Sequence, residues 1–454
     1  MVDNEADGAV PAAVPGRFRN DYADPRDAGQ RLSDKDGVRR QAVGLGQTAA
    51  QDGYRRELLA AVQGRRAARS DLLAFHLTKD PAGREVAVVS GDLLVRSDTR
   101  NDARLIRALA PYGFQVTPVE ALQGRVLRLS NPDLSVDRLT DIARFIRTSG
   151  HQASVNHITP LGPVIKGRGG PENTRAVLPY PPSCAGQAGE RPVRIAIIDT
   201  GITAEQRTDG WLHGLATAGN IDLLDDLPTP NGFLDFGAGH GTFNAGIAAQ
   251  VAPDADLSIY RAVDSDGVGS EATVATAMVQ AVEDGATILN LSLGVDTVDS
   301  QPLVAIEVAL DLIAEMDPEV LVFAAAGNDG STRPCWPAAS KRVVAVAALA
   351  ADLTPAPWSN RGFWVDCSAV GEGIVSTYVQ GVESPELDPK PDTFGANAWA
   401  VWSGTSFAAP QVAAAVARIV QEDSCPPREA LRRLFAERHV LPDYGFVVPI
   451  LAGT

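Results

Sequence analysis

The stretch Ser403-Gly404-Thr405-Ser406-Phe407-Ala408-Ala409-Pro410 joins a turn of small residues to an expected helix that runs from Ser406 to Gln421. The positive end of a helix and its free backbone N–H groups favour negative charge beside Ser406. The alanines that follow allow this helix to sit deep in the molecule. Because a serine that only caps a buried helix has the same pattern, the stretch makes Ser406 a candidate nucleophile without deciding its chemistry.

Three further motifs place reactive side chains where strands or turns meet helices. Ile198-Asp199-Thr200-Gly201 puts a carboxylate at the carboxyl end of a strand, the edge where α/β sheets build their sites. Gly239-His240-Gly241-Thr242 puts a histidine between two glycines, which allow close backbone approach. Ala324-Ala325-Ala326-Gly327-Asn328 ends a strand in an amide suited to binding an oxyanion. Each motif alone has an ordinary structural explanation, but their joint occurrence in this order indicates a nucleophilic serine site.

Around these motifs the sequence predicts an α/β domain over residues 185–454. Continuous apolar runs are typical of buried parallel strands, and helical stretches separate them, so we expect a parallel sheet with helices on both faces. The expected strands are Val193–Ile198, Ala255–Tyr260, Thr287–Leu291, Val320–Ala325 and Val343–Val346, and the expected helices are Asn244–Gln250, Glu271–Glu283, Pro302–Ala314 and Ser406–Gln421.

The part before this domain divides into three segments. Residues 1–75 contain few large apolar side chains, so we expect a flexible N-terminal arm with a helix between Tyr54 and Leu73. Residues 76–160 predict a small α+β domain with the order β-α-β-β-α-β, a split βαβ sandwich. Residues 161–184 are rich in glycine and proline and predict a linker.

The order Asp199, His240, Ser406, with these flanks, resembles that of the subtilisin-like serine proteases, the subtilases. The resemblance covers about 192–420, and its most specific parts are the flanks of His240 and Ser406. The chain departs from the family pattern at Phe243 and Asn244, where a His-Val pair is commoner, and at Phe407, where methionine is usual.

The resemblance implies a subtilisin-like fold and a serine endopeptidase that forms an acyl-enzyme on Ser406. His240 would be its base, Asp199 would orient that base, and Asn328 would bind the oxyanion. Peptide or protein substrates would bind as extended strands, without a cofactor. The implied substrate-binding residues are Gly267, Val268, Gly269, Ser292, Leu293 and Gly294 along the cleft, with Ala324, Ala325 and Gly327 lining the pocket for the residue before the cut. Structural calcium is common in the family, but the sequence identifies no metal site.

The resemblance also suggests that residues 76–160 are the chain's own inhibitory propeptide, so that the protein is made as a zymogen. Cleavage would then fall between His157 and Arg168, with Lys166 and Arg168 as exposed candidates. A permanent accessory domain is the alternative. For the whole chain, the alternatives are a peptide ligase or cyclase on the same site, and a catalytically silent peptide-binding protein.

Composition limits the partners. The formal net charge is −16 and the pI about 4.8, which disfavours nucleic acid. The sequence shows neither a secretory signal nor a run of apolar residues long enough to cross a membrane, so we expect a cytoplasmic protein. In that compartment Cys184, Cys335, Cys367 and Cys425 would be free thiols. A Cys335–Cys367 disulfide is the alternative.

Overall fold

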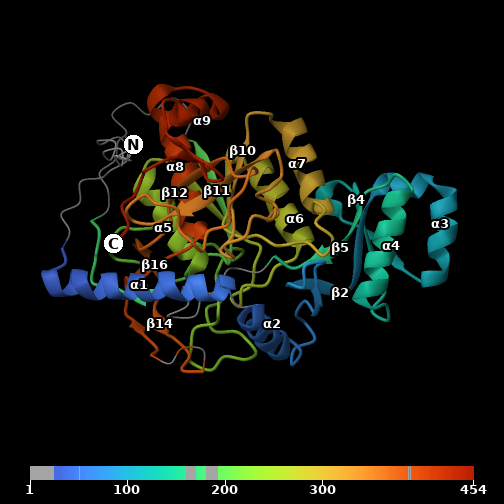
Figure 1. Cartoon of the computed structure of the whole chain (residues 1–454), viewed down its shortest axis with the longest axis horizontal. Coiled ribbons are helices and arrows are strands. Elements are labelled where there is room, and N and C mark those ends of the chain that lie inside the picture. The colour runs from blue at the N-terminus through green and yellow to red at the C-terminus, as the bar shows by residue number, and fades with distance from the viewer. Residues whose placement is uncertain (1–24, 51, 160–169, 180–192, 387, 389) are drawn as a thin grey trace, which may run out of the picture.

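The computed structural model describes residues 25–50, 52–159, 170–179, 193–386, 388 and 390–454. Figure 1 shows a central body, a narrower lobe at one side that residues 75–159 form, and a long N-terminal helix along the body. Most of the expected linker lies outside the described residues, as do Lys166, Arg168 and Cys184.

An eight-stranded sheet forms the centre of the body, in the order β17-β18-β12-β11-β10-β9-β7-β8. All neighbouring strands in it are parallel except β17 and β18. Its strands are β7 (Arg194–Asp199), β8 (Asp256–Arg261), β9 (Ile288–Leu291), β10 (Leu321–Ala325), β11 (Val343–Leu349), β12 (Cys367–Val370), β17 (Val440–Leu441) and β18 (Gly445–Val447). The predicted parallel α/β architecture is confirmed, since β7 to β11 coincide with the apolar runs.

Helices cover both faces of this sheet (Figure 1). Alternate side chains of a strand point to opposite faces. Ile195 and Ile197 therefore pack in one core with α5 and α8, whereas Ala196 and Ile198 pack in another with α6 and α7. The helices of the body are α5 (His240–Val251), α6 (Glu271–Glu283), α7 (Val304–Met316), α8 (Thr405–Asp423) and α9 (Pro427–Phe435).

Two smaller sheets complete the body. Strands β13 (Ile374–Thr377), β16 (Trp399–Trp402) and β6 (Glu172–Asn173) form an antiparallel sheet with β16 in the middle. Strands β14 (Gly381–Val382) and β15 (Thr393–Phe394) form a hairpin-like pair. The first sheet matters for function because β16 ends directly before the turn that leads to Ser406.

The lobe has the predicted β-α-β-β-α-β order, with the antiparallel sheet order β3-β4-β2-β5. One strand was not predicted, β1, which pairs with the first half of the long strand β2. The strands are β1 (Phe75–Lys79), β2 (Glu85–Arg96), β3 (Gln115–Pro118), β4 (Val126–Ser130) and β5 (Ala153–His157); the helices are α3 (Ala103–Leu109) and α4 (Val136–Thr148), with short 3₁₀ turns η1 (Ser97–Asn101), η2 (Ala110–Tyr112) and η3 (Glu120–Leu122).

The lobe packs against α6 and α7, and its buried side chains belong to the same apolar cluster as theirs. Arginines of the lobe pair with acids of the body around this contact. The Arg125 guanidinium donates to both carboxylate oxygens of Glu315 at 2.7 Å, and this hydrogen bonding lowers the pKa of Glu315. Arg96 pairs with Asp311 at 2.9 Å. Exposed pairs of this kind contribute little stability each, but they fix the orientation of docking.

The expectation of a flexible arm is wrong for residues 28–50, which form α1 (Ala28–Ala50). The helix expected between Tyr54 and Leu73 is confirmed as α2 (Asp52–Arg66), which starts and ends somewhat earlier. Helix α1 buries Val38, Gln41 and Leu45, which recur at helical spacing on one face. A stripe with so few large apolar residues carries almost no periodic signal. Tertiary contacts with the body, rather than amphipathic patterning, therefore hold this helix.

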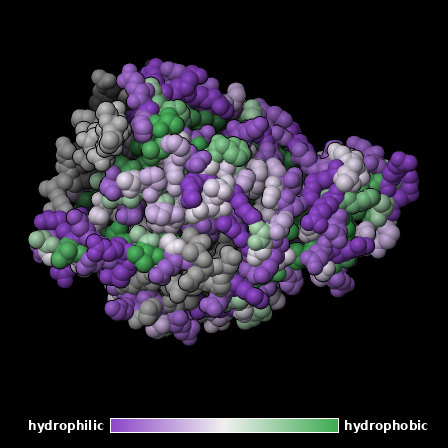
Figure 2. All heavy atoms as spheres, viewed as in Figure 1, coloured by the Kyte–Doolittle hydropathy of each residue, from purple (hydrophilic) through white to green (hydrophobic). Residues whose placement is uncertain are grey.

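The remaining sequence predictions concern cysteines and membrane spans. Cys367 and Cys425 are buried free thiols, so the alternative Cys335–Cys367 disulfide is wrong. Within the described ranges, none of the helices is both long and apolar enough to cross a bilayer. Figure 2 shows a mostly hydrophilic face on which apolar side chains occur in small scattered groups.

Candidate active site

Asp199 ends β7, at the carboxyl edge of the parallel sheet, and is fully buried. Its Oδ1 accepts a hydrogen bond from the backbone N–H of Thr200 at 2.8 Å and lies 2.7 Å from Nδ1 of His240. Its Oδ2 accepts from the side-chain amide of Asn244 at 2.9 Å. The carboxylate is therefore fixed on both oxygens and aimed at the imidazole.

His240 begins α5, and the flanking glycines let its loop approach the Asp199 loop closely. Gly239 has a φ of +81°, and a Cβ there would lie 2.7 Å from the Tyr378 ring. A Cβ on Gly241 would lie 2.1 Å from the carbonyl oxygen of Gly201. No other residue fits at either position, so the predicted reason for these glycines holds.

Aromatic rings enclose the imidazole of His240. The centroid of the Trp402 ring lies 5.4 Å away, edge to face, and that of Phe407 lies 5.5 Å away. His240 is buried, at 2% exposed. Phe407 is one of the departures from the family pattern noted in the sequence, and it contributes directly to this wall.

Ser406 lies at the start of α8 and is buried. Its Oγ donates to the carbonyl oxygen of Ser292 at 3.0 Å. Both Ser406 and His240 belong to the described part of the chain, and no hydrogen bond joins Oγ to Nε2. The Phe407 contact nevertheless places the start of α8 beside the imidazole. Nucleophile–base hydrogen bonds are often loose without substrate and tighten when it binds.

Ser292 supports the start of α8 in a second way. Pro410 lies inside the helix and has no N–H to offer the carbonyl four residues earlier, that of Ser406. The hydroxyl of Ser292 donates to this carbonyl at 2.7 Å and replaces the missing bond. The proline of the motif and the serine on the neighbouring strand end therefore act as one unit that holds the nucleophile.

Asn328 follows β10 and lies beside the turn before Ser406. Its Oδ1 accepts from both the backbone N–H and the hydroxyl of Thr405, each at 2.9 Å. Its Nδ2 makes no hydrogen bond to any residue that the structure describes, and it lies 3.6 Å from where a Cβ on Gly404 would stand. One end of the amide is thus anchored, and the donor end is left for an anion formed near Ser406.

The structure brings together a buried Asp–His pair, a serine at a helix N-terminus and an uncommitted amide donor. The family model described as "Subtilase family" matches residues 190–437, more than half of the chain, and includes all four residues. The chain belongs to the subtilase family. This establishes the family that the sequence motifs suggested, and it agrees with the parallel sheet and the helix order described above.

Known proteins resemble this subtilase over part of its sequence or in its fold. It is 34% identical over 238 residues to the "Thermophilic serine proteinase" of Bacillus sp. (strain AK1), covering 50% of this chain and 52% of that protein. It is 34% identical over 230 residues to "Thermitase" of Thermoactinomyces vulgaris, covering 48% and 72%. The chain therefore matches only about half the length of the first of these relatives. Fervidolysin from Fervidobacterium pennivorans shares its fold, with a TM-score of 0.55 and 19% identity over 80% of this chain and 60% of that one.

One expected substrate-binding segment, Gly267 to Gly269, is paired with the end of the lobe. Ile158 forms an antiparallel bridge with Ser270, and the backbone N–H of Thr159 donates to the carbonyl of Gly269 at 2.7 Å. The side chain of Val268 is buried in a cluster that includes Ile158. The chain that leaves β5 therefore adds a short strand to this edge.

Helix α2 ends on the same edge. The Arg66 guanidinium donates to both oxygens of Asp266 at 2.8 Å and to Asp264 at 2.9 Å. Burial raises the pKa of Asp266 to about 6, an effect that outweighs its attraction to Arg66. At neutral pH the carboxylate is still charged, so the ion pair remains intact.

The other expected substrate-binding residues fall at two places. Ser292 contacts Ser406 as described, Leu293 is buried in the core, and a Cβ on Gly294 would meet Cys335 Sγ at 2.7 Å. Ala324 and Ala325 are buried in β10, and Gly327 is partly exposed. The backbone of these segments lies at the carboxyl edge of the sheet with the four catalytic candidates. Their roles in binding stay predictions.

Two residues that were not among the predicted site residues support the site. The side-chain amide of Asn244, one turn after His240, donates to Asp199 Oδ2. The Oδ1 of Asn244 has no hydrogen-bond partner among the described residues. Asp222 accepts from the Thr200 hydroxyl and the Gly239 N–H, both at 2.8 Å. It thus joins the loops that carry Asp199 and His240. Asn244 carried a signal, its departure from the family pattern, whereas Asp222 had none.

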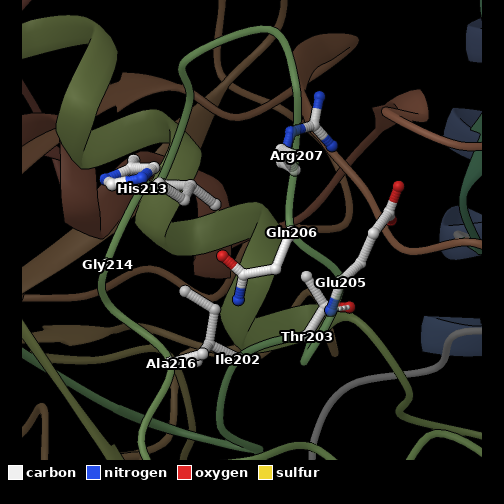
Figure 3. A pocket seen from close by; sticks show the side chains of 9 residues that line it. Ile202, Thr203, Glu205, Gln206, Arg207, His213, Gly214 and Ala216 are labelled. Atoms are coloured by element: carbon white, nitrogen blue, oxygen red, sulfur yellow. Dashed lines mark hydrogen bonds between the residues drawn. The ribbon is translucent and has the colours of Figure 1, made fainter.

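A separate pocket of about 300 Å³, including space open to solvent, lies on the loop after β7. Figure 3 shows the side chain of Gln206 lying across it, near Ile202. None of the four catalytic candidates lines it, so it is not the cleft for the reaction. Its lining consists of Ile202, Thr203, Glu205, Gln206, Arg207, Leu212, His213, Gly214 and Ala216. Within the described ranges, no group of three or more His, Cys, Asp or Glu side chains is arranged to hold a metal ion.

Replacing Asn328 with aspartate is expected to lower kcat by about 10²–10³ with little change in KM. The variant keeps an oxygen to accept from Thr405, so the turn stays anchored, but it loses the amide donor. Steady-state kinetics on a peptide substrate would measure the effect. Asn328→Leu should lose as much kcat and, in addition, some thermal stability. A kcat within threefold of wild type in both variants would remove Asn328 from the reaction.

Asp222 predicts a specific pH dependence of stability. Burial raises its pKa from 3.8 to about 6, although hydrogen bonds from Gly239, Thr200 and Leu224 oppose the shift. A carboxyl whose pKa is raised on folding destabilises the folded state when charged, by about 3 kcal/mol above pH 6, and this penalty shrinks as the pH falls toward 4. In a Ser406→Ala background, the free energy of unfolding of Asp222→Asn relative to its parent should therefore be about 2 kcal/mol higher at pH 7.5 than at pH 4.5. Urea unfolding at the two pH values measures this, and a constant difference would contradict it.

Proposed function

We propose that this subtilase is a serine endopeptidase that hydrolyses peptide bonds through an acyl-enzyme on Ser406. The observation that carries the proposal is the buried Asp199–His240 contact of 2.7 Å beside the helix start that holds Ser406. The uncommitted amide of Asn328 supplies the remaining part. One relative above is named a serine proteinase, which supports the same reaction.

The residues divide the chemistry in the following way. His240 takes the proton of Ser406 as its oxygen attacks the peptide carbonyl, and later gives that proton to the leaving amine. Asp199 holds the imidazole in the required tautomer and stabilises its charged form. Asn328 Nδ2 and the backbone N–H of Ser406 bind the oxyanion. Water then repeats the sequence on the acyl-enzyme, and the enclosing rings of Trp402 and Phe407 keep the imidazole away from bulk solvent.

The lobe acts as an inhibitory propeptide in this proposal. Support comes from Ile158 and Thr159, which occupy the edge where substrate strands are expected. Charge gives further support: residues 1–160 carry a net charge of +3, whereas residues 161–454 carry −19. Opposite charges favour docking of the two parts, as the arginine–acid pairs illustrate. No observation favours the ligase or the silent binding protein.

The test uses the full chain, wild type beside Ser406→Ala, incubated and then treated with a fluorophosphonate probe. We expect the wild type to be cut between His157 and Arg168, to hydrolyse a peptide and to be labelled on Ser406, with the variant inert in all three respects. Mass spectrometry identifies the new amino terminus and the labelled residue. A folded wild type without label or hydrolysis would exclude the endopeptidase, and hydrolysis by an uncut chain would exclude the propeptide.

A further inference from the structure

Helix α1 docks on a part of the body that the lobe does not touch. Figure 1 shows it beside β16, on the opposite side of the body from α3 and α4. We call the surface that it covers the α1 site, formed by β6, β16, Ser403, Gly373 and Trp358. The lobe and α1 thus hold the body at two separate places, with α2 between them in sequence.

Gln41 is the polar centre of the α1 site and is fully buried. Its Nε2 donates to the carbonyl of Val401 at 2.9 Å and to that of Gly170 at 2.8 Å. Its Oε1 accepts from the Ser403 hydroxyl at 2.7 Å. A buried amide with these bonds made is strongly specified, because removing it leaves its partners unsatisfied.

Apolar contacts flank this centre. Leu45 is fully buried in a cluster with Ala348, Ala356 and Trp358. Val38 packs closely on Gly373, where an added Cβ would lie 3.0 Å from a Val38 methyl. Val43, on the opposite face of the same helix, is 54% exposed. The docked face is therefore distinct from the rest of α1.

Helix α1 also contacts the chain just after the segment of proposed cleavage. Arg40 pairs with Glu172 at 2.9 Å, and the hydroxyl of Thr174 donates to Asp34 at 2.6 Å. With Gly170, these residues would form the start of the mature enzyme. A cut before Gly170 would leave α1 on one fragment and its partners on the other.

We propose that α1 is a second anchor of the N-terminal fragment, one that holds the two sides of the cut together and delays release. This inference rests on the proposed function for its biological meaning. When two linked contacts hold one fragment, breaking one of them leaves the other in place. The broken contact then re-forms quickly, because its two sides remain at high effective concentration. Cleavage and release of the lobe are then separate steps, and α1 governs the second.

The test follows release independently of the chain's own activity. The full chain carries Ser406→Ala and a site for an added protease placed within residues 160–169. After the cut, the rate at which the N-terminal fragment leaves is measured by size-exclusion chromatography and by light scattering over time. We expect the parent fragment to stay bound for hours.

Three variants distinguish the outcomes. Leu45→Ala removes buried apolar contact and should speed release by about 100-fold. Gln41→Ala removes the buried amide and should speed it by about tenfold or more. Val43→Ala is the matched control on the exposed face and should release like the parent. Immediate release from the parent, or equal rates for Leu45→Ala, Gln41→Ala and the control, would overturn the proposal. Absence of Ser406-dependent hydrolysis in the wild type would instead defeat the proposed function, so the two failures are distinguishable.

Discussion

Replacing His240 with alanine is expected to lower kcat on a peptide substrate by about 10⁶, with KM nearly unchanged. The serine hydroxyl is a poor nucleophile at neutral pH, so losing its base removes acylation and leaves only the contribution of oxyanion binding. The structure offers no substitute base in the enclosure, since the described groups that contact the imidazole are the rings of Trp402 and Phe407 and the side chains of Asp199 and Asn244. Kinetics would be measured on chains freed of the N-terminal fragment after a cut by an added protease.

His213→Ala provides a matched control for this experiment. His213 is exposed on the loop after β7 and lines the separate pocket rather than the active site. This variant should keep kcat within a factor of two of wild type. Comparable losses in both variants would show that the assay responds to the fold instead of the base, and activity in His240→Ala above a hundredth of wild type would reject the proposed role.

The second large effect is expected for Asp199→Asn, with kcat lower by about 10⁴ and the fold retained. The structure explains the retention. Asn244 has an unpartnered Oδ1, so its amide can turn over and accept from the new Nδ2 of the variant. The contact of Oδ1 with His240 is then kept, and the variant lacks mainly the negative charge that stabilises the imidazolium. Thermal unfolding measures whether the fold is retained, and steady-state kinetics measures the loss of kcat.

A control removes a charge elsewhere on the body. Asp352 is exposed and caps a turn through Thr354, so Asp352→Asn should leave kcat unchanged. If Asp199→Asn unfolds at a temperature well below that of the wild type, its loss of kcat could not be attributed to the missing negative charge alone. If it stays folded and loses less than tenfold, Asp199 does not have the role proposed for it.

The four catalytic candidates were predictable from sequence because each lies in a short motif whose flanking residues help to form the same site. Gly239 and Gly241 are needed for close approach, and Pro410 follows Ser406 where its missing N–H has consequences. The parallel sheet was predictable for a similar reason, since a strand buried on both faces must be apolar throughout. In such cases the residues next to a functional or buried position are constrained with it, so the sequence shows the pattern locally.

The partners of buried polar groups were not predictable in this way. Asp222 joins the Asp199 and His240 loops, and Gln41 reaches Ser403 across most of the chain length. Hydrophobic periodicity tells which face of an element is covered, but not what covers it. The absence of a periodic apolar stripe also led to the wrong expectation of a flexible arm where α1 lies.

The sequence alone was enough to predict the α/β architecture, the order of elements in the lobe and the four catalytic candidates, because local patterns of apolar and reactive side chains encode them. Three contacts became visible only in the folded structure: α1 docks beside the turn before Ser406, Asn244 fixes Asp199, and the chain after β5 pairs with the backbone at Gly269 and Ser270. The physical reason is that a buried hydrogen bond or ion pair needs a partner at a fixed distance, and that partner comes from a distant part of the chain.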